Sequence, residues 1–288
     1  MKKERLKFWI FLAPALLSFL IVVVIPTIIG FFYSLTDWDG LNSEKSFVGF
    51  KNFIYIFTKD EHFLKSLWFT VGVTFFSIIF INLMGLFLAM IVTQKFKGNS
   101  FLRGLFFMPN LIGGLLLGFT WKFIFTEIFS AISKLTGFSF LNGWLGTTKT
   151  GFWGLIIINV WQLSGYMMVV YIAQLQQIPY SAKEAAQIDG ANSIQTFFKI
   201  TFPLIMPAFT IGLFLSIANS FKIFDQNLAL TNGVPYRSTE MLALNIYNTA
   251  FTNNEFGLAQ AKSIIFLIIV ATIGITQLMI TKKKEVEM

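Results

Sequence analysis

The chain has 288 residues, of which 55% are hydrophobic and 12% are charged, and its formal net charge is +8. Phenylalanine alone accounts for 36 residues, one in eight. The polar surface of a soluble protein of this size could not cover so much apolar side chain. The composition therefore excludes a soluble enzyme, a disordered chain and a fibrous repeat, and it predicts an all-α polytopic membrane protein.

The chemistry available to the chain is narrow. There is no cysteine, which excludes disulfides, thiolate metal sites and cysteine nucleophiles. His62 is the single histidine, so a histidine-based metal site is excluded, and no metal or cofactor is expected. The sequence contains neither a phosphate-binding Gly-x4-Gly-Lys-[Ser/Thr] loop nor a Gly-x-Ser-x-Gly elbow. We therefore expect a protein that is not itself an enzyme.

Six segments approach the length of about 20 mostly apolar residues that a membrane span needs. They predict one membrane domain over residues 1–288. In chain order they are residues 8–33, 68–92, 103–125, 153–175, 203–224 and 258–280. The first follows a basic stretch, as a signal peptide does, but its apolar run is too long, contains Pro14 and Pro26, and lacks a cleavage site of small residues. An uncleaved first span is expected.

The charges predict the orientation of these spans. With an internal N-terminus, the inner segments hold twelve basic and five acidic residues, which is +7 of the total +8. Basic residues collect on the cytoplasmic side of membrane proteins. We therefore expect a multi-pass protein of the plasma or inner membrane with both termini in the cytoplasm. The basic balance reports topology and does not indicate a nucleic-acid partner.

The inner connection over residues 176–202 has the clearest local signals. Pro179 ends the preceding helix, and Ser181 with Glu184 has the spacing of a capping box for a helix over residues 182–189. Gly190 suits the left-handed residue that ends such a helix, and Asn192 or Ser193 can cap a second short helix. These residues predict two short cytoplasmic helices. They leave open whether the pair docks a partner or only covers the bundle.

The same loop carries a motif that runs from Glu184 to Ala191, Glu-Ala-Ala-Gln-Ile-Asp-Gly-Ala, followed by Pro203 and Pro207. It resembles the EAA loop of binding-protein-dependent ABC importer permeases. Segments at residues 12–16, 34–38, 47–50, 105–109 and 230–239 resemble the carbohydrate-importer branch of that family, most of all its maltose-transporter larger membrane subunits. The chain departs from the common pattern at Asn192-Ser193, where a small residue and proline are frequent.

This resemblance implies a type I importer permease fold and a function. The EAA loop of the family is the coupling helix that docks in a cleft of a cytoplasmic ATPase. The chain would form half of the translocation pathway of an ATP-driven oligosaccharide importer. The implied partners are a second, homologous permease in a heterodimer, two ABC ATPase subunits, an extracytoplasmic solute-binding protein and a sugar. The implied docking residues are Glu184, Ala185, Ala186, Asp189, Gly190 and Ala191.

Polar residues within the predicted spans are candidates for a solute pathway. Asn159, Gln162 and Tyr166 share one helical face, and Pro109 can break the third span locally. The resemblance places the sugar contacts of the family at Asn110, Asn159, Gln162, Tyr166, Asn219 and Ser220. The alternative for each is a hydrogen bond between helices. The tryptophans Trp121, Trp144, Trp153 and Trp161 are expected to be interfacial or packing residues.

Lys222 has three interpretations. Its side chain can extend to the membrane interface, it can pair with Asp225, or it can meet an anionic solute. The sequence does not choose among them, and it does not name the sugar.

Two other functions compete with import driven by a docked ATPase. A secondary transporter would need an acidic or histidine relay within the membrane or a sodium site, and the central predicted spans contain no Asp or Glu. An assembly or insertase subunit is supported by composition alone. The EAA-like loop favours the importer.

Overall fold

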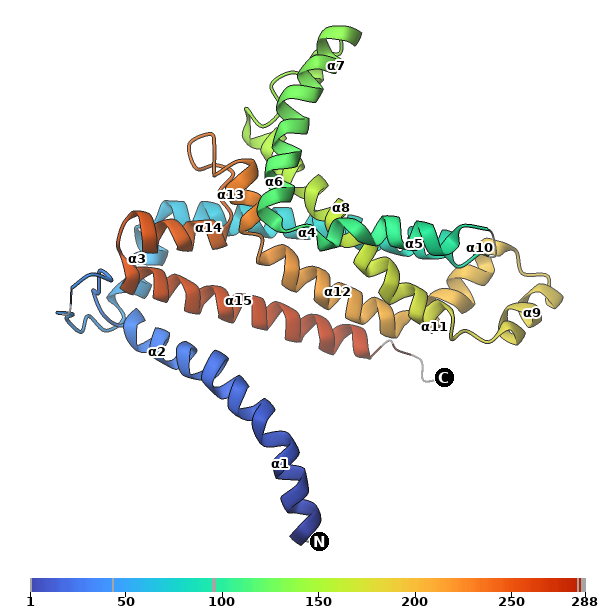
Figure 1. Cartoon of the computed structure of the whole chain (residues 1–288), viewed down its shortest axis with the longest axis horizontal. Helices are drawn as coiled ribbons and strands as arrows, with labels where there is room; N and C mark the ends of the chain where they lie inside the picture. Colours follow the sequence, from blue (N-terminus) through green and yellow to red (C-terminus); the bar gives the residue numbers. More distant parts are fainter. Residues whose placement is uncertain (1, 43, 95–96, 284, 286–288) are drawn as a thin grey trace. The chain divides into compact units, whose positions relative to one another are not determined.

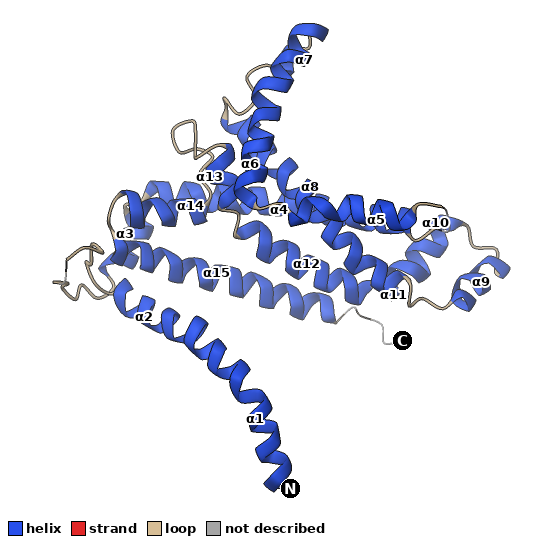
Figure 2. Cartoon of the chain, viewed as in Figure 1, coloured by secondary structure: helices blue, strands red, loops and turns tan. Residues whose placement is uncertain are grey.

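The computed structural model of the chain describes residues 2–42, 44–94, 97–283 and 285. Within these residues every regular element is a helix, as Figure 2 shows. In chain order (Figure 1) the α-helices are α1 (Lys2–Phe19), α2 (Ile25–Ser34), α3 (Lys51–Thr58), α4 (Glu61–Val92), α5 (Asn99–Phe107), α6 (Gly114–Phe123), α7 (Phe129–Thr136), α8 (Thr148–Leu175), α9 (Tyr180–Ile188), α10 (Ser193–Thr196), α11 (Phe202–Leu204), α12 (Met206–Phe221), α13 (Asp225–Leu230), α14 (Leu242–Tyr247) and α15 (Phe256–Lys282).

Among the described residues, five helical segments are long and apolar enough to cross a membrane. A sixth span is formed if the two arms of a bent pair, Ser193–Leu204 and Met206–Phe221, are counted as one; the arms meet at 70°. These helices confirm the predicted all-α membrane architecture. The five continuous segments are Phe8–Ser34, Glu61–Val92, Gly114–Thr136, Thr148–Leu175 and Phe256–Lys282.

The third span, predicted over residues 103–125, is not one continuous helix. The chain tightens into a 3₁₀ turn at Met108–Leu111, and Ile112 is extended, with φ −80° and ψ 128°. A new helix begins at Gly114 and continues through a π-helical turn to Thr136. The cause is Pro109, which has no N–H to donate within a helix. The local break expected at Pro109 is confirmed.

The fifth span also differs from its prediction over residues 203–224. Helix α12 starts later, at Met206, and ends earlier, at Phe221. Backbone hydrogen bonds continue across the bend before α12. The Ile205 amide donates to the Thr201 carbonyl at 3.1 Å, and the Ile205 carbonyl accepts from the Phe209 amide at 3.0 Å. The corner therefore leaves the backbone of Ile205 satisfied although this residue is fully buried.

The internal contacts divide the chain into two compact units. The first combines Met1–Leu64 with Asn245–Ile268, and the second combines Lys65–Leu244 with Ile269–Met288. In the first unit, helix α2 packs on α15 at a glycine: a Cβ on Gly30 would lie 2.8 Å from the Gln260 Oε1. The most apolar stretch of the first span has 0% of its residues buried within the chain. That surface is free to contact lipid or another protein.

In the second unit, one buried polar side chain joins three helices. Asn82 of α4 accepts from the Tyr171 hydroxyl of α8 at 2.5 Å and donates to the Ser216 hydroxyl of α12 at 3.0 Å. Asn82 is 4% exposed, and the other two side chains are fully buried. Hydrogen bonds of this kind between helices hold membrane bundles together. Helices α4, α8 and α12 thus form the framework on which the candidate sites lie.

Candidate functional site

The loop over residues 176–202, predicted to be cytoplasmic and to couple to an ATPase, contains Pro179, which precedes helix α9. Pro179 is extended, with ψ 134°, and its carbonyl accepts from the Ala182 amide at 3.2 Å. Helix α9 starts at Tyr180, so Ser181 lies inside its first turn and makes no side-chain cap. The predicted capping box of Ser181 and Glu184 is therefore wrong, because the proline two residues earlier already sets the helix start.

The end of α9 agrees with the sequence. Gly190 has a φ of +79°, its amide donates to the Gln187 carbonyl at 3.1 Å, and the Ala191 amide donates to the Ala186 carbonyl at 2.9 Å. This is a Schellman motif, which satisfies the last carbonyls of a helix. Asn192 then caps α10 in a reciprocal box with Gln195, both bonds measuring 2.9 Å. The two predicted short helices joined at Gly190 are confirmed, and Figure 1 shows them as a pair beyond the end of α8.

The six predicted docking residues differ in exposure. Ala186 is buried and Ala191 is half-buried, whereas the others are exposed. The exposed face of α9 also presents Tyr180 and Ile188, with 76% and 80% of their surface exposed, one turn on either side of Glu184. Large apolar side chains left uncovered around a carboxylate are typical of a protein interface. Sequence reasoning missed Tyr180 and Ile188, although the four-residue spacing around Glu184 could have identified them.

A cavity of about 700 Å³ adjoins this loop. Lys183, Gln187 and Ala191 line it from the loop, and Met90 and Thr93 line it from the end of α4. Part of the loop therefore lies over a cavity, and the loop is not close-packed against the helices along its whole length.

The break in the third span forms a polar site with helix α8. The carbonyl of Ile112 accepts from Gln162 Nε2 at 3.2 Å, and Gln162 Oε1 accepts from Gln226 Nε2 at 2.7 Å. The three groups form one chain of hydrogen bonds from the break to the start of α13, in which each bond polarises the next. Asn110 lies half-buried in the 3₁₀ turn two residues before Ile112.

The structure joins two other predicted sugar contacts to each other. Asn159 Nδ2 of α8 donates to the Ser220 hydroxyl of α12 at 2.8 Å. Their exposed fractions are 2% and 0%. This is the alternative that the sequence left open, a hydrogen bond between helices. Of the remaining two, Tyr166 is half-buried against the apolar cluster around α4 and α8, and Asn219 is exposed.

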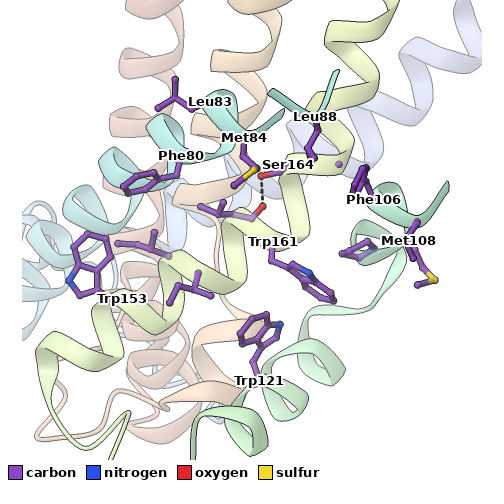
Figure 3. A pocket seen from close by; sticks show the side chains of 16 residues that line it. Phe80, Leu83, Met84, Leu88, Phe106, Met108, Trp121, Trp153, Trp161 and Ser164 are labelled. Atoms are coloured by element: carbon purple, nitrogen blue, oxygen red, sulfur yellow. Dashed lines mark hydrogen bonds between the residues drawn. The ribbon is translucent and has the colours of Figure 1, made fainter. Parts of the chain in front are cut away.

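A second cavity of about 760 Å³ lies beside α8 and is lined mainly by apolar and aromatic side chains (Figure 3). Trp121 and Trp161 meet edge to face, with ring centroids 5.6 Å apart. The hydroxyl of Ser164 donates to its own helix, to the Val160 carbonyl at 2.6 Å. None of the six predicted sugar contacts lines this cavity. The sequence shows the tryptophans, but it does not predict that Trp121, Trp153 and Trp161 line a cavity.

Lys222 follows α12 as its C-terminal cap, and its side chain is exposed. Among the described residues no ion pair joins it to Asp225. The carboxylate of Asp225 lies instead over the start of α6, where a Cβ on Gly114 would be 3.1 Å from Asp225 Oδ2. The N-terminal end of a helix favours a negative charge. Of the three interpretations of Lys222, pairing with Asp225 is not the one the structure adopts.

Known proteins that are similar to this chain agree with the transport function predicted from its sequence. A family model described as a binding-protein-dependent transport system inner membrane component matches residues 81–285. A probable permease for starch degradation products from Thermoanaerobacterium thermosulfurigenes is 51% identical over 286 residues, which are 99% of this chain and 97% of the relative. The permease of a multiple sugar-binding transport system from Streptococcus mutans is 34% identical over 279 residues, 96% of each chain.

Solved structures show the same fold. A chain of a bacterial ABC transporter involved in the import of the acidic polysaccharide alginate superposes with a TM-score of 0.83 at 20% identity, covering 98% of this chain and 96% of that one. A bacterial alginate ABC transporter in complex with a periplasmic protein bound to an alginate pentasaccharide gives a TM-score of 0.80 at 19% identity, with 96% and 93% coverage.

Proposed function

We propose that this chain, which belongs to the family of binding-protein-dependent transport system inner membrane components, is the membrane-spanning permease subunit of an ATP-driven carbohydrate importer. The observation that carries the proposal is the 51% identity, over 99% of the chain, to a permease for starch degradation products. Oligosaccharides derived from starch are accordingly the first substrates to test. The chain forms half of the pathway, and ATP hydrolysis takes place on a partner.

The partners follow from what one chain lacks. One coupling loop and an uncovered first span support a heterodimer with a second, homologous permease. Two cytoplasmic ABC ATPases would dock on the two coupling loops. An extracytoplasmic binding protein would deliver the sugar, which agrees with the family description, that of a binding-protein-dependent transport system. Both termini would lie in the cytoplasm; this orientation rests on the charge count, in which Lys95 and Lys284 lie outside the described residues.

The coupling element is the exposed surface of α9 and the turn after it. Glu184, Ala185, Asp189 and Gly190 are exposed there, and Tyr180 and Ile188 add apolar contact area. Ala186 and Ala191 hold the turn in shape through the bond between them. The Glu184 carboxylate is free to pair with a basic residue of the ATPase because the structure gives it no role as a cap.

The sugar contacts follow the exposure of the six predicted residues. Asn219 is exposed and Asn110, Gln162 and Tyr166 are half-buried, so these four can meet a solute at the surface of the chain. Both polar atoms of Gln162 already have a partner, so Gln162 would contact a solute through its second amide hydrogen. Asn159 and Ser220 would first have to break the hydrogen bond between them. We propose the first four as the primary contacts.

The decisive experiment replaces Gly190 in the complex of both permeases, both ATPases and the binding protein. No atom lies within 4 Å of a Cβ at Gly190, so Gly190→Trp adds a ring outside the bundle, with about 1–2 kcal/mol of strain from the left-handed backbone. Gly190→Asn is the matched control, because asparagine tolerates this conformation. We expect the tryptophan variant to lose maltotriose uptake and sugar-stimulated ATPase activity while it still unfolds near the wild-type temperature.

The asparagine variant should keep most of both activities. Wild-type uptake by Gly190→Trp would contradict the docking assignment and would favour a transporter that works without a docked ATPase.

A further inference from the structure

The cavity beside the loop over residues 176–202 is lined by one face of helix α9. Its volume is about 700 Å³. Lys183 and Gln187 line it, and because they lie four residues apart they share a helical face. Glu184 and Ile188 each follow by one residue, do not line the cavity, and lie on a neighbouring face. Helix α9 therefore has two faces, the exposed one proposed to dock the ATPase and one that borders the cavity.

The cavity has a positive charge that no acidic residue balances. Among the described residues that line it, Lys183 carries the charge and none is Asp or Glu. Lys183 is half-buried, and no ion pair includes it within the described part of the chain. The side chains of Gln176, Gln187 and Ser193 also line the cavity and make no hydrogen bond to a described residue. A lysine with unused amide and hydroxyl donors beside it suits an anion.

Other parts of the lining are apolar. Met90 and Leu175 contribute from helices α4 and α8, and Ile194 and Phe198 from the segment after Asn192. Ile194 and Phe198 are 71% and 63% exposed and lie four residues apart. A small hydrated anion would leave these side chains in water. A ligand that joins an anionic group to a hydrocarbon chain would cover them, which is favourable.

The ends of two membrane spans meet at this cavity. Helices α4 and α8 are both long and apolar enough to cross a bilayer, and Met90 and Leu175 lie in their last turns. A helix that crosses the hydrocarbon core, which is about 30 Å thick, has its end at or beyond the edge of that core. The lipid headgroups lie directly outside that edge. The cavity is therefore placed where phosphate groups and acyl chains are both within reach.

We propose that this cavity binds an anionic phospholipid. The lipid phosphate accepts hydrogen bonds from the Lys183 ammonium and the Gln187 amide, and an acyl chain covers Ile194 and Phe198. A lipid in this position supports α9 from the side opposite its docking contacts and holds Glu184 toward the ATPase. That effect on coupling rests on the proposed function, whereas the binding of lipid does not.

Binding is measured on the complete complex in detergent, without ATP or sugar. Native mass spectrometry follows a titration with phosphatidylglycerol, or with phosphatidylcholine of the same acyl chains, which has no net charge. We expect phosphatidylglycerol to bind more tightly, and Lys183→Met to weaken it about tenfold, the scale of one lost hydrogen bond to a charged group. Lys183→Arg keeps the charge and should recover binding.

Lys199→Met is the matched control. Lys199 is an exposed lysine of the same loop that does not line the cavity, so its variant should bind phosphatidylglycerol as the wild type does. Wild-type binding by Lys183→Met would overturn the proposal. An equal loss in Lys199→Met would overturn it too, since the attraction would then come from the basic surface as a whole and not from the cavity.

Inorganic phosphate tests the other source of the same anion. If phosphate raises the unfolding temperature of the wild-type complex but not that of Lys183→Met, and phosphatidylglycerol raises neither, the cavity binds a free anion and the lipid assignment is wrong. We expect the reverse, a rise with phosphatidylglycerol that depends on Lys183 and no rise with phosphate.

ATPase activity separates this inference from the proposed function. In nanodiscs that contain phosphatidylglycerol, sugar-stimulated activity should exceed that in phosphatidylcholine alone severalfold, and Lys183→Met should lose this dependence. If lipid binds at Lys183 but the complex imports no oligosaccharide, the lipid site stands and the proposed function fails. If the complex imports maltotriose while Lys183→Met binds lipid normally, the proposed function stands and the lipid site is wrong.

Discussion

The ammonium nitrogen of Lys262 in α15 lies 2.7 Å from the Asp60 carboxylate, just before α4, and both side chains are almost fully buried. Lys262 also donates to Asn245 Oδ1 at 3.0 Å and to the Thr249 hydroxyl at 2.7 Å. The other oxygen of Asp60 accepts from the Phe63 amide at 2.9 Å. The three donors of Lys262 are thus all bonded, and one carboxylate both caps α4 and neutralises the lysine within the first unit.

Removal of one partner of this pair should destabilise the protein strongly. Lys262→Met leaves a buried carboxylate without its counter-charge, which costs about 3–5 kcal/mol. The double variant Asp60→Asn with Lys262→Met removes both charges and should cost clearly less. Denaturant unfolding in detergent measures both. Equal losses in the single and double variants would show that the charges do not interact.

Acid should weaken the same interaction. Burial alone would raise the pKa of Asp60, but the hydrogen bonds from Lys262 and the Phe63 amide and the charges of Lys262 and His62 outweigh it, and they lower that pKa below 3.8. The pair therefore stabilises the fold fully above the ordinary carboxyl pKa, and this contribution is lost as the pH falls through the lowered folded-state value. We expect the unfolding temperature to drop in that acid range.

In Asp60→Asn the part of the drop due to this carboxyl should be absent, so its curve of unfolding temperature against pH should be flatter below pH 3.8. Parallel curves for the two proteins would contradict the assignment.

The contact between α5 and α8 depends on a missing side chain. A Cβ on Gly165 would lie only 1.8 Å from the Phe106 carbonyl oxygen, and a backbone atom cannot turn away as a side chain can. Gly165→Ala should therefore force the helices apart and cost about 1–3 kcal/mol or more. Gly104→Ala in α5 is the control, since no atom lies within 4 Å of its Cβ; it should be neutral or stabilising by up to about 1 kcal/mol. Thermal unfolding compares them, and similar midpoints would refute the contact.

The bond between Asn159 and Ser220 predicts an energetic coupling. A double-mutant cycle with Asn159→Ala and Ser220→Ala should give about 0.6 kcal/mol, the mean for polar contacts between membrane helices. Because the two side chains satisfy each other, we expect the KM for sugar uptake to stay within about twofold of wild type, well under the tenfold that a lost charged hydrogen bond gives. A larger KM in both single variants would instead identify them as sugar contacts.

Some features could be predicted because their causes are local. The left-handed Gly190, the cap at Asn192 and the helix break at Pro109 each depend on residues within a few positions, and all three are confirmed. The capping box at Ser181 failed for a local reason too: Pro179 competes for the same helix start. Two strong signals two residues apart cannot both begin one helix.

Other features depend on contacts that sequence patterns do not reveal. The spacing of Asn159 and Gln162 predicted that they share a helical face. It did not predict that Asn159 would donate a hydrogen bond to Ser220, 61 residues away. The end of α12 at Phe221 likewise could not be read from the hydropathy of the span. A helical period predicts which residues of one helix share a face. It does not predict which residues of other helices they contact.

The bent pair of arms that meets at Ile205 has a mechanical consequence. The backbone of Ile205 is hydrogen-bonded on both sides of the corner, and its side chain is buried. We therefore expect the two arms to move as one rigid unit. A sideways displacement of α10, which directly follows the exposed loop at Gly190, would tilt α12 rather than slide it. The far end of α12 is the turn with Asn219 and Lys222, so a small displacement of the α10 arm would be larger there.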